Sequence, residues 1–190
     1  MKRRICTVIL LALLGAACSS RASLTSPQNS NVPPNGDLKF KAPDGWVTEK
    51  PSSTMRVAQY KLPKAEGDPE DASLVLYYFG AAQGGTTQAN IDRWIGQMQQ
   101  PDGSASKDKA KTDNLTVNGL KVSTVDVTGT YTAEMSPGSG DRHNNADYRL
   151  RAAVIETPKG NYFAKLIGPA KTIARWEPAF MDYLKSFEFK

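Results

Sequence analysis

The sequence predicts an α+β fold with a mostly antiparallel sheet flanked by helices, and three observations lead to this expectation. The run LVLYYF within residues 73–79 is apolar at consecutive positions, which indicates a strand covered on both faces. Residues 87–98 and 173–187 carry apolar side chains at helical spacing. Turn residues at Asn118-Gly119 and Pro158-Lys159-Gly160 separate strand-like runs, as in hairpins. Hairpin strands pair antiparallel and helices cover them, so we expect an α/β sandwich.

Short strands are expected at the start of this sandwich, which we place at residues 38–190. Leu38 to Ala42 is predicted to be a strand leading into a turn at Pro43-Asp44-Gly45, where proline and glycine occupy favoured turn positions. Met55 to Leu62 is the second predicted strand. Ser73 to Phe79 is the third, and its apolar faces require helices on the sheet.

The first helix is predicted to follow Thr87 as its N-cap and to end at Pro101-Asp102-Gly103. Its apolar stripe has the spacing i, i+3, i+4 and i+7 and consists of Ile91, Trp94, Ile95 and Met98.

The second helix is predicted near the C-terminus. Its apolar stripe consists of Ile173, Trp176, Phe180, Tyr183, Leu184 and Phe187. Pro178 lies inside this stripe and lacks a backbone N–H. We therefore expect a kink, or two helices of which the second begins at Glu177 and Pro178.

Two hairpins are predicted between the helices. Asn118-Gly119 is expected to join Leu115–Val117 to Leu120–Tyr131. Asp147–Thr157 and Asn161–Gly168 are expected to pair around Pro158-Lys159-Gly160.

Two polar segments are predicted to be mobile surface loops. Gly103 to Asp113 contains KDKAK, and Glu134 to Asp147 reads EMSPGSGDRHNNAD.

The N-terminus has the order of a secretory signal, which we place at residues 1–17. Lys2, Arg3 and Arg4 form a positive region, and an apolar run from Ile5 to Leu14 follows. This run is shorter than the roughly 20 residues of a membrane-spanning helix. The segment is therefore excluded from the fold.

Leu14 to Cys18 reads LGAAC and resembles a bacterial lipobox, although glycine stands where most lipoboxes have leucine, three residues before the cysteine. We predict Cys18 as the lipid attachment site. Cys6 lies in the signal, so Cys18 is the only cysteine of the mature chain, and lipidation would block its thiol. The alternative is an ordinary secreted protein cut before Cys18 or after Ala22.

Residues 18–37 are predicted to be the lipidated cysteine and a flexible tether. Ser19 to Asp37 is rich in Ser, Asn and Pro, with too few apolar residues to order itself. It would span roughly 60 Å when stretched and about 25 Å on average. Two or more acyl chains give a stable membrane anchor. Because Ser19 is not the aspartate that retains enteric lipoproteins in the inner membrane, we expect the periplasmic face of the outer membrane.

The net charge of the mature chain argues against nucleic acid as a partner. The net charge of +5 includes Lys2, Arg3 and Arg4, so the mature chain has 21 of the 24 basic residues against 19 acidic ones. This balance argues against nucleic acid, and so do Lys107, Lys109 and Lys111, which have no interleaved aromatic residues.

A family resemblance covers most of residues 38–190. The opening F-x-A-P-x-G-W of Phe40 to Trp46, the hairpin ETPKGNYFAKLIGP and the terminal ARWEPAFMDYLKSFEF resemble PsbP-like domains, which also occur as small bacterial lipoproteins. The resemblance implies an α/β/α sandwich in an extrinsic, non-enzymatic protein that binds membrane complexes. It implies no functional residue.

The segment from Gly80 to Thr87 lies close to a phosphate-binding pattern, but Thr86 replaces the required lysine. We predict a structural glycine connection that ends in a threonine cap.

Catalytic and metal sites are not predicted. Ser139 lacks the G-x-S-x-G frame, and His143 with Asp141 and Asp147 matches no zinc or EF-hand spacing. An exported hydrolase or a metal-binding module that uses the 134–147 loop is kept as the alternative.

Two further groups have structural interpretations. Asp68, Glu70 and Asp71 are predicted to form a solvated acidic turn in preference to a calcium site. Tryptophans can stack on sugars, but Trp94 and Trp176 lie on core stripes, so packing is the prediction for these two and for Trp46.

The function that we predict is a lipid-anchored envelope protein with a non-catalytic binding or assembly domain. Its partners would be the membrane, through Cys18, and an envelope protein or small ligand. No cofactor is expected.

Overall fold

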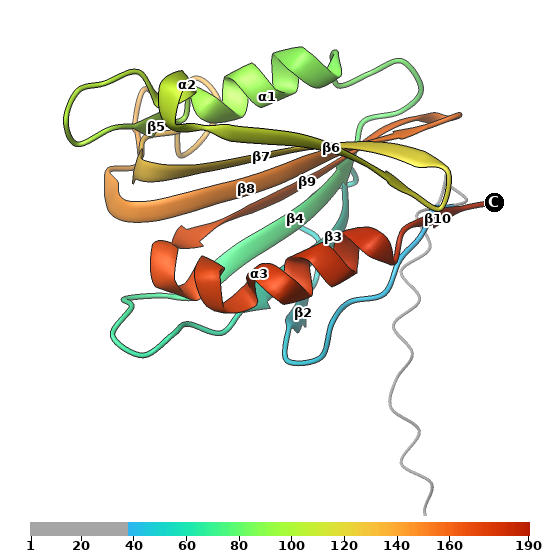
Figure 1. Cartoon of the computed structure of the whole chain (residues 1–190), viewed down its shortest axis with the longest axis horizontal. Coiled ribbons are helices and arrows are strands. Elements are labelled where there is room, and N and C mark those ends of the chain that lie inside the picture. The colour runs from blue at the N-terminus through green and yellow to red at the C-terminus, as the bar shows by residue number, and fades with distance from the viewer. Residues whose placement is uncertain (1–37) are drawn as a thin grey trace, which may run out of the picture.

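The computed structural model describes residues 38–190 (Figure 1). The predicted signal, Cys18 and the tether lie outside these residues. In the described part, none of the helices has both the length and the apolar character needed to cross a membrane.

An antiparallel sheet of eight strands forms the middle layer. Its strand order is β2-β3-β4-β9-β8-β7-β5, and β6 pairs with β7 outside this path. The strands are β2 (Val47–Glu49), β3 (Arg56–Leu62), β4 (Ala72–Tyr78), β5 (Met98–Gln99), β6 (Lys111–Val117), β7 (Leu120–Tyr131), β8 (Asn145–Thr157) and β9 (Gly160–Pro169). The predicted α+β class is therefore confirmed, because helices cover both faces of this sheet (Figure 1).

Both predicted hairpins are present. Val117 pairs with Leu120 across Asn118-Gly119, whose φ angles of 48° and 83° are those that a two-residue hairpin turn requires. Thr157 pairs with Gly160 across the second turn.

Helix α3 (Ala170–Lys185) covers one face of the sheet. It continues unbroken through Pro178, so the predicted division into two helices is wrong. The reason is tertiary packing, since Ile173 before the proline and Phe180 after it are both buried in the same core. This core also holds the inward residues Leu74 of β4 and Leu166 of β9.

Helix α1 (Thr87–Ile95) covers part of the other face and buries Ile91, Trp94 and Ile95. Its ends differ from the prediction. Thr86, and not Thr87, is the N-cap, because its hydroxyl accepts a hydrogen bond from the Ala89 N–H at 3.2 Å. The helix stops at Gly96, and Met98 lies in β5.

The segment 103–113 was predicted to be a surface loop, but the structure shows that only part of it is one. It contains the short helix α2 (Ser106–Lys109) and the start of β6, whose polar residues Lys111 to Asn114 pair with β7.

The ends of the described chain meet. Strand β1 (Leu38–Lys39) pairs with β10 (Glu188–Phe189) in a separate two-stranded sheet. The predicted first strand is therefore shorter than Leu38 to Ala42.

Candidate functional site

A cavity of about 880 Å³ opens on the α1 side of the sheet. Helix α1 packs mainly against β7 and β8, which leaves part of β4 and β9 open on this face. Alternate residues of a strand point to the same face, so Val75 and Tyr77 of β4 and Lys165 and Ile167 of β9 line the floor. The prediction that helices cover both faces of β4 is thus only partly correct. We call this cavity the β4–β9 pocket.

The loop between β7 and β8 contributes a wall of the pocket. The wall and rim residues from this region are Tyr131, Ala133, Glu134, Met135, Pro137, Arg142, His143, Asn145 and Tyr148. The loop is held by a bridge between Glu134 and Arg142, and by the His143 N–H, which donates to the Ala133 carbonyl at 2.9 Å. The 134–147 segment, predicted to be a surface loop, therefore borders the β4–β9 pocket.

Lys165 is the central side chain of the floor. Its Nζ donates to Gln97 Oε1 at 2.6 Å and to Tyr131 Oη at 3.1 Å. It also lies 5.1 Å from the centre of the Tyr131 ring. Burial, and secondarily the charge of Arg93, lower the pKa of Lys165 to about 8. Both hydrogen-bond acceptors are neutral groups, so no carboxylate of the described residues compensates the charge.

Two tyrosines stand beside this lysine. The rings of Tyr131 and Tyr148 are stacked, with centroids 6.3 Å apart and planes at 7°. Burial raises the pKa of both phenols to about 12, with Glu70 a further cause at Tyr148, so both are neutral donors at ordinary pH. The imidazole of His143 lies 5.0 Å from the Tyr131 ring.

The acidic residues that line the pocket already have partners. Glu70 accepts hydrogen bonds from Tyr148 Oη and, at 3.4 Å, from Asn145. Asp71 accepts from the Lys64 N–H at 2.9 Å, and Glu134 accepts from the Gly138 N–H at 3.0 Å. None of these carboxylates is paired with a pocket cation in the described structure.

The structure does not assemble a hydrolase site in the loop. Ser139 Oγ donates to the Ser136 carbonyl at 2.9 Å, and no hydrogen bond joins it to His143 in the described residues. Asp141 and Asp147 do not line the pocket. Within residues 38–190, no group of three or more His, Cys, Asp and Glu side chains is placed to hold a metal ion.

The predicted solvated acidic turn is correct for Glu70 and Asp71, which are exposed, whereas Asp68 is partly buried and has a structural role. Asp68 Oδ2 accepts hydrogen bonds from the backbone N–H and the hydroxyl of Thr172, at 2.8 and 2.6 Å. Glu70 and Asp71 bind Tyr148 and Lys64, as described above.

The glycine connection before α1 is structural. Gly84 has a φ of 85°, and a Cβ there would lie 2.6 Å from the Phe163 ring, so only glycine fits. The segment ends in the Thr86 cap, and β4 lies between antiparallel neighbours, unlike the strand of a phosphate-binding loop.

Packing is confirmed for the tryptophans. Trp46 and Trp94 are buried, and Trp176 Nε1 donates to the Pro63 carbonyl at 2.8 Å.

The predicted basic loop is divided between two elements. Lys107 and Lys109 belong to α2 and Lys111 to β6, and none of them lines the β4–β9 pocket.

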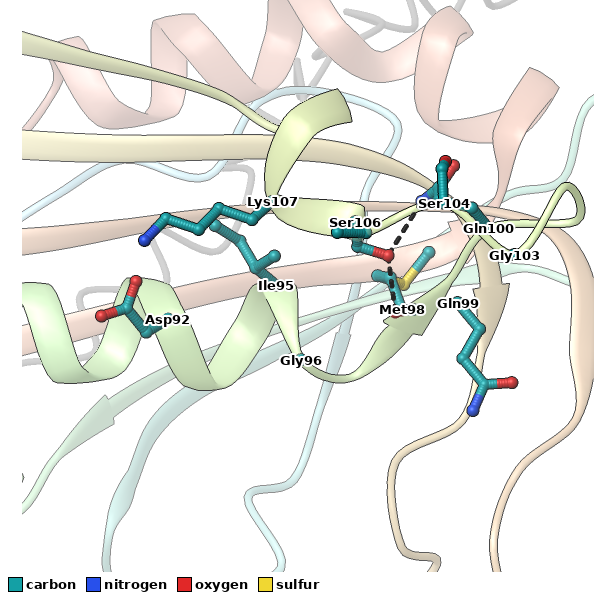
Figure 2. A pocket seen from close by; sticks show the side chains of 11 residues that line it. Asp92, Ile95, Gly96, Met98, Gln99, Gln100, Gly103, Ser104, Ser106 and Lys107 are labelled. Atoms are coloured by element: carbon teal, nitrogen blue, oxygen red, sulfur yellow. Dashed lines mark hydrogen bonds between the residues drawn. The ribbon is translucent and has the colours of Figure 1, made fainter.

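A second cavity of about 610 Å³ lies between the end of α1 and the loop before α2 (Figure 2). Its central hydroxyl, Ser106 Oγ, donates to the Met98 carbonyl at 2.7 Å and accepts from Gln100 at 3.0 Å. These bonds are internal and satisfy the group, whereas Lys165 has only neutral partners. The β4–β9 pocket is therefore the better candidate site.

Sequence reasoning missed Lys165, Arg93, Tyr131 and Tyr148. One signal was available, because Lys165 is a lone cation within the apolar strand YFAKLIG. Charged side chains are rarely buried without a partner, so a lysine at such a position is a candidate functional residue.

Solved structures with similar folds are known, whereas no family model and no curated protein matches the chain. LpqN, involved in cell envelope biogenesis of Mycobacterium tuberculosis, has a TM-score of 0.51 and 11% identity, over 82% of this chain and 86% of LpqN. This likeness shows a shared fold.

Two further structures are similar at lower TM-scores. Cyanobacterial PsbP from Synechocystis has a TM-score of 0.45 and 13% identity, over 81% of this chain and 87% of PsbP. PA94, a Pseudomonas aeruginosa protein of unknown function, has a TM-score of 0.46 and 15% identity, over 80% of this chain and 91% of PA94.

Proposed function

We propose that this protein is a lipid-anchored component of the cell envelope whose domain binds a small molecule in the β4–β9 pocket without transforming it. The observation that carries the proposal is the pocket itself. A cavity of about 880 Å³ lies within the size range of small-molecule sites, and it combines a smaller apolar part, including Val75 and Ile167 of the floor, with many polar and charged side chains.

Binding is favoured over catalysis by the arrangement of the reactive groups. His143 has no hydroxyl nucleophile and no carboxylate within hydrogen-bond reach in the described residues, although it faces Tyr131. Tyr131 and Tyr148 have pKa values of about 12, which make them poor general bases. The hydroxyl of Tyr148 already donates to Glu70, whereas that of Tyr131 accepts from Lys165 and can donate its hydrogen to a ligand.

The envelope location is supported by the lipobox-like sequence before Cys18 and by the polar tether that follows it. LpqN, the protein with the same fold, is involved in cell envelope biogenesis. An acylated Cys18 would hold the domain at the periplasmic face of the outer membrane.

The anchor is tested by fractionation and intact-mass analysis of the full chain. The wild type should sediment with membranes and carry acyl chains on Cys18, and Cys18→Ser should be soluble in the periplasm. A membrane-bound serine variant, or an unmodified wild-type N-terminus, would overturn the anchor.

Ligand binding is tested with immobilised full-length protein and small-molecule extracts of cell envelopes, analysed by mass spectrometry. Ser73→Phe places a ring in the pocket, and Thr48→Phe adds the same ring on the exposed edge strand β2. The wild type and Thr48→Phe should enrich the same compound, and Ser73→Phe should not. Enrichment of no compound would refute small-molecule binding. Consumption of the compound by the wild type would favour the hydrolase alternative instead.

A further inference from the structure

We propose that the occupant of the β4–β9 pocket is an anionic small molecule, with a phosphate or carboxylate group beside Lys165 and an apolar or ring-shaped body against Tyr131. This inference rests on the proposed function and specifies its ligand class.

The first argument is an uncompensated charge. The cations that line the pocket are Arg56, Arg93, Arg142 and Lys165. Arg93 donates to Asn90, Arg56 donates to Gln59 at 2.8 Å, and Lys165 donates to Gln97 and Tyr131. These acceptors are all neutral. Among the described residues, no ion pair joins any of these cations to a carboxylate.

On the opposite face of the sheet, which α3 covers, partly buried cations are paired with carboxylates. Arg149 binds Asp126 bidentately, and its third nitrogen lies 2.9 Å from Glu177. Arg151 lies 3.0 Å from Glu177 and 3.5 Å from Asp126. Partly buried arginines on the α3 side thus have carboxylates within reach. Lys165, partly buried on the α1 side, has none.

Burying a charge without an opposite partner is unfavourable, and an anionic ligand would remove that penalty. The carboxylates of Glu70, Asp71 and Glu134 at the rim are hydrogen-bonded to neutral donors, and within the described residues none of them forms an ion pair with Lys165. A phosphate or carboxylate oxygen between Lys165 and Arg93 would make charge-assisted hydrogen bonds to both.

The body of the ligand is suggested by the surfaces next to the lysine. The largely buried rings of Tyr131 and Tyr148 are part of the pocket lining, and the 60% exposed Met135 stands at the rim without apolar cover. Such surfaces bind rings or acyl chains and add little for a bare inorganic ion.

The test uses two dyes that differ by one acidic group. Anilinonaphthalene sulfonate is anionic, N-phenylnaphthylamine is its neutral counterpart, and both fluoresce on binding. We expect full-length protein to bind the sulfonate at least about tenfold more tightly, the ratio that one charge-assisted bond gives. The Ser73→Phe variant should bind neither dye in the pocket.

Lys165→Met should reduce sulfonate affinity about tenfold and leave the affinity for the neutral dye unchanged. The neutral dye thereby reports that the pocket is still folded. Lys61→Met removes a cation of β3 that does not line the pocket and should change neither affinity. The proposal that the ligand is anionic would be overturned by equal affinities of the wild type for the two dyes. It would also be overturned if Lys165→Met left the affinity for the sulfonate unaltered.

Competition experiments distinguish the kinds of molecule that could supply the acidic group of the ligand. A short-chain phosphatidylglycerol, its phosphatidylcholine counterpart, benzoate and inorganic phosphate are each added against the bound sulfonate. Displacement by phosphatidylglycerol alone identifies a lipid headgroup, and displacement by benzoate identifies a soluble organic acid. Displacement by phosphatidylcholine as effectively as by phosphatidylglycerol contradicts recognition of a net anion. Ligand capture from envelope extracts that yields only neutral compounds would refute this inference and leave the proposed function standing.

Discussion

Asp68 Oδ2 accepts two hydrogen bonds from Thr172, one from the backbone N–H at 2.8 Å and one from the hydroxyl at 2.6 Å. Thr172 lies in the first turn of α3, whose N-cap residue Pro169 provides no side-chain cap. The carboxylate therefore performs the capping from a loop far away in the sequence, and its charge complements the positive end of the helix.

Replacing this carboxylate should destabilise the domain. We expect Asp68→Ala to lower the free energy of unfolding by about 1 to 2 kcal/mol, because a buried helix N–H and a buried hydroxyl lose their acceptor. Glu66→Ala, an exposed neighbour, is the control and should change stability by less than about 0.5 kcal/mol. Urea denaturation of the two variants measures the difference. Equal midpoints would show that Asp68 is not a cap in solution.

Lys165 should reduce stability at neutral pH. Its pKa in the folded protein is lowered to about 8, so the unfolded chain binds more protons between about pH 8 and 10.5, and stability rises with pH in that window. Lys165→Met should therefore raise the free energy of unfolding at pH 7 by about 1 to 3 kcal/mol. The gain should shrink as the pH approaches 10.5. A variant that is less stable than the wild type at pH 7 would contradict the uncompensated charge.

Anion binding should depend on the same proton. Charged and titratable groups from several elements line the pocket together with Lys165. They are Arg56 on β3, Tyr77 on β4, Arg93 on α1, Tyr131 on β7, Tyr148 on β8, Glu70 and Asp71 in the loop before β4, and Glu134, Arg142 and His143 in the loop between β7 and β8. Because Lys165 loses its proton above about pH 8, we expect sulfonate affinity to fall between pH 7 and pH 9, with proton uptake on binding near pH 8. Calorimetry in buffers of different ionisation enthalpy measures this uptake. His143→Gln should retain it, and loss of the uptake in that variant would assign the proton to the imidazole.

Tyr183 is expected to tolerate loss of its hydroxyl. It is fully buried, and no partner for its Oη is found within the described residues. Removing an unsatisfied polar group relieves a desolvation penalty, so Tyr183→Phe should leave stability unchanged or raise it by about 1 kcal/mol. Tyr78→Phe loses the 2.7 Å bond to the Lys159 carbonyl and should be destabilised by about 1 kcal/mol. Thermal unfolding compares the two, and a larger loss in Tyr183→Phe would reveal a partner.

Local signals in the sequence predict the parts of the fold that depend on neighbouring residues. Asn118-Gly119 indicates its hairpin because both residues accept positive φ angles. The stripe of Ile91, Trp94 and Ile95 indicates α1 because these side chains bury one face.

The parts that failed depend on distant contacts. Polar residues Lys111 to Asn114 form a strand only because β7 lies beside them. The continuity of α3 at Pro178 depends on the core beneath it, which no window of the sequence contains.

Only part of the candidate site could be predicted from the sequence. The 134–147 segment was identified as a surface loop, and His143 within it does line the pocket. Lys165 and Tyr131 belong to different strands, and their meeting depends on the order β9-β8-β7 and on where α1 stops. The lone cation in the strand YFAKLIG was visible in the sequence, but whether its charge is paired depends on its three-dimensional surroundings.

The pairing of Leu38 with Phe189 has a mechanical consequence. Tension applied to the chain before Leu38 would act first on the two-residue ladder of β1 and β10, which is separate from the eight-stranded sheet. Opening that short ladder would draw Leu38 out of the core on the α3 side, whereas the ladders that hold Lys165 belong to the other sheet. If the domain is tethered through the chain before Leu38, tension on the tether would therefore reach this corner before it reaches the β4–β9 pocket.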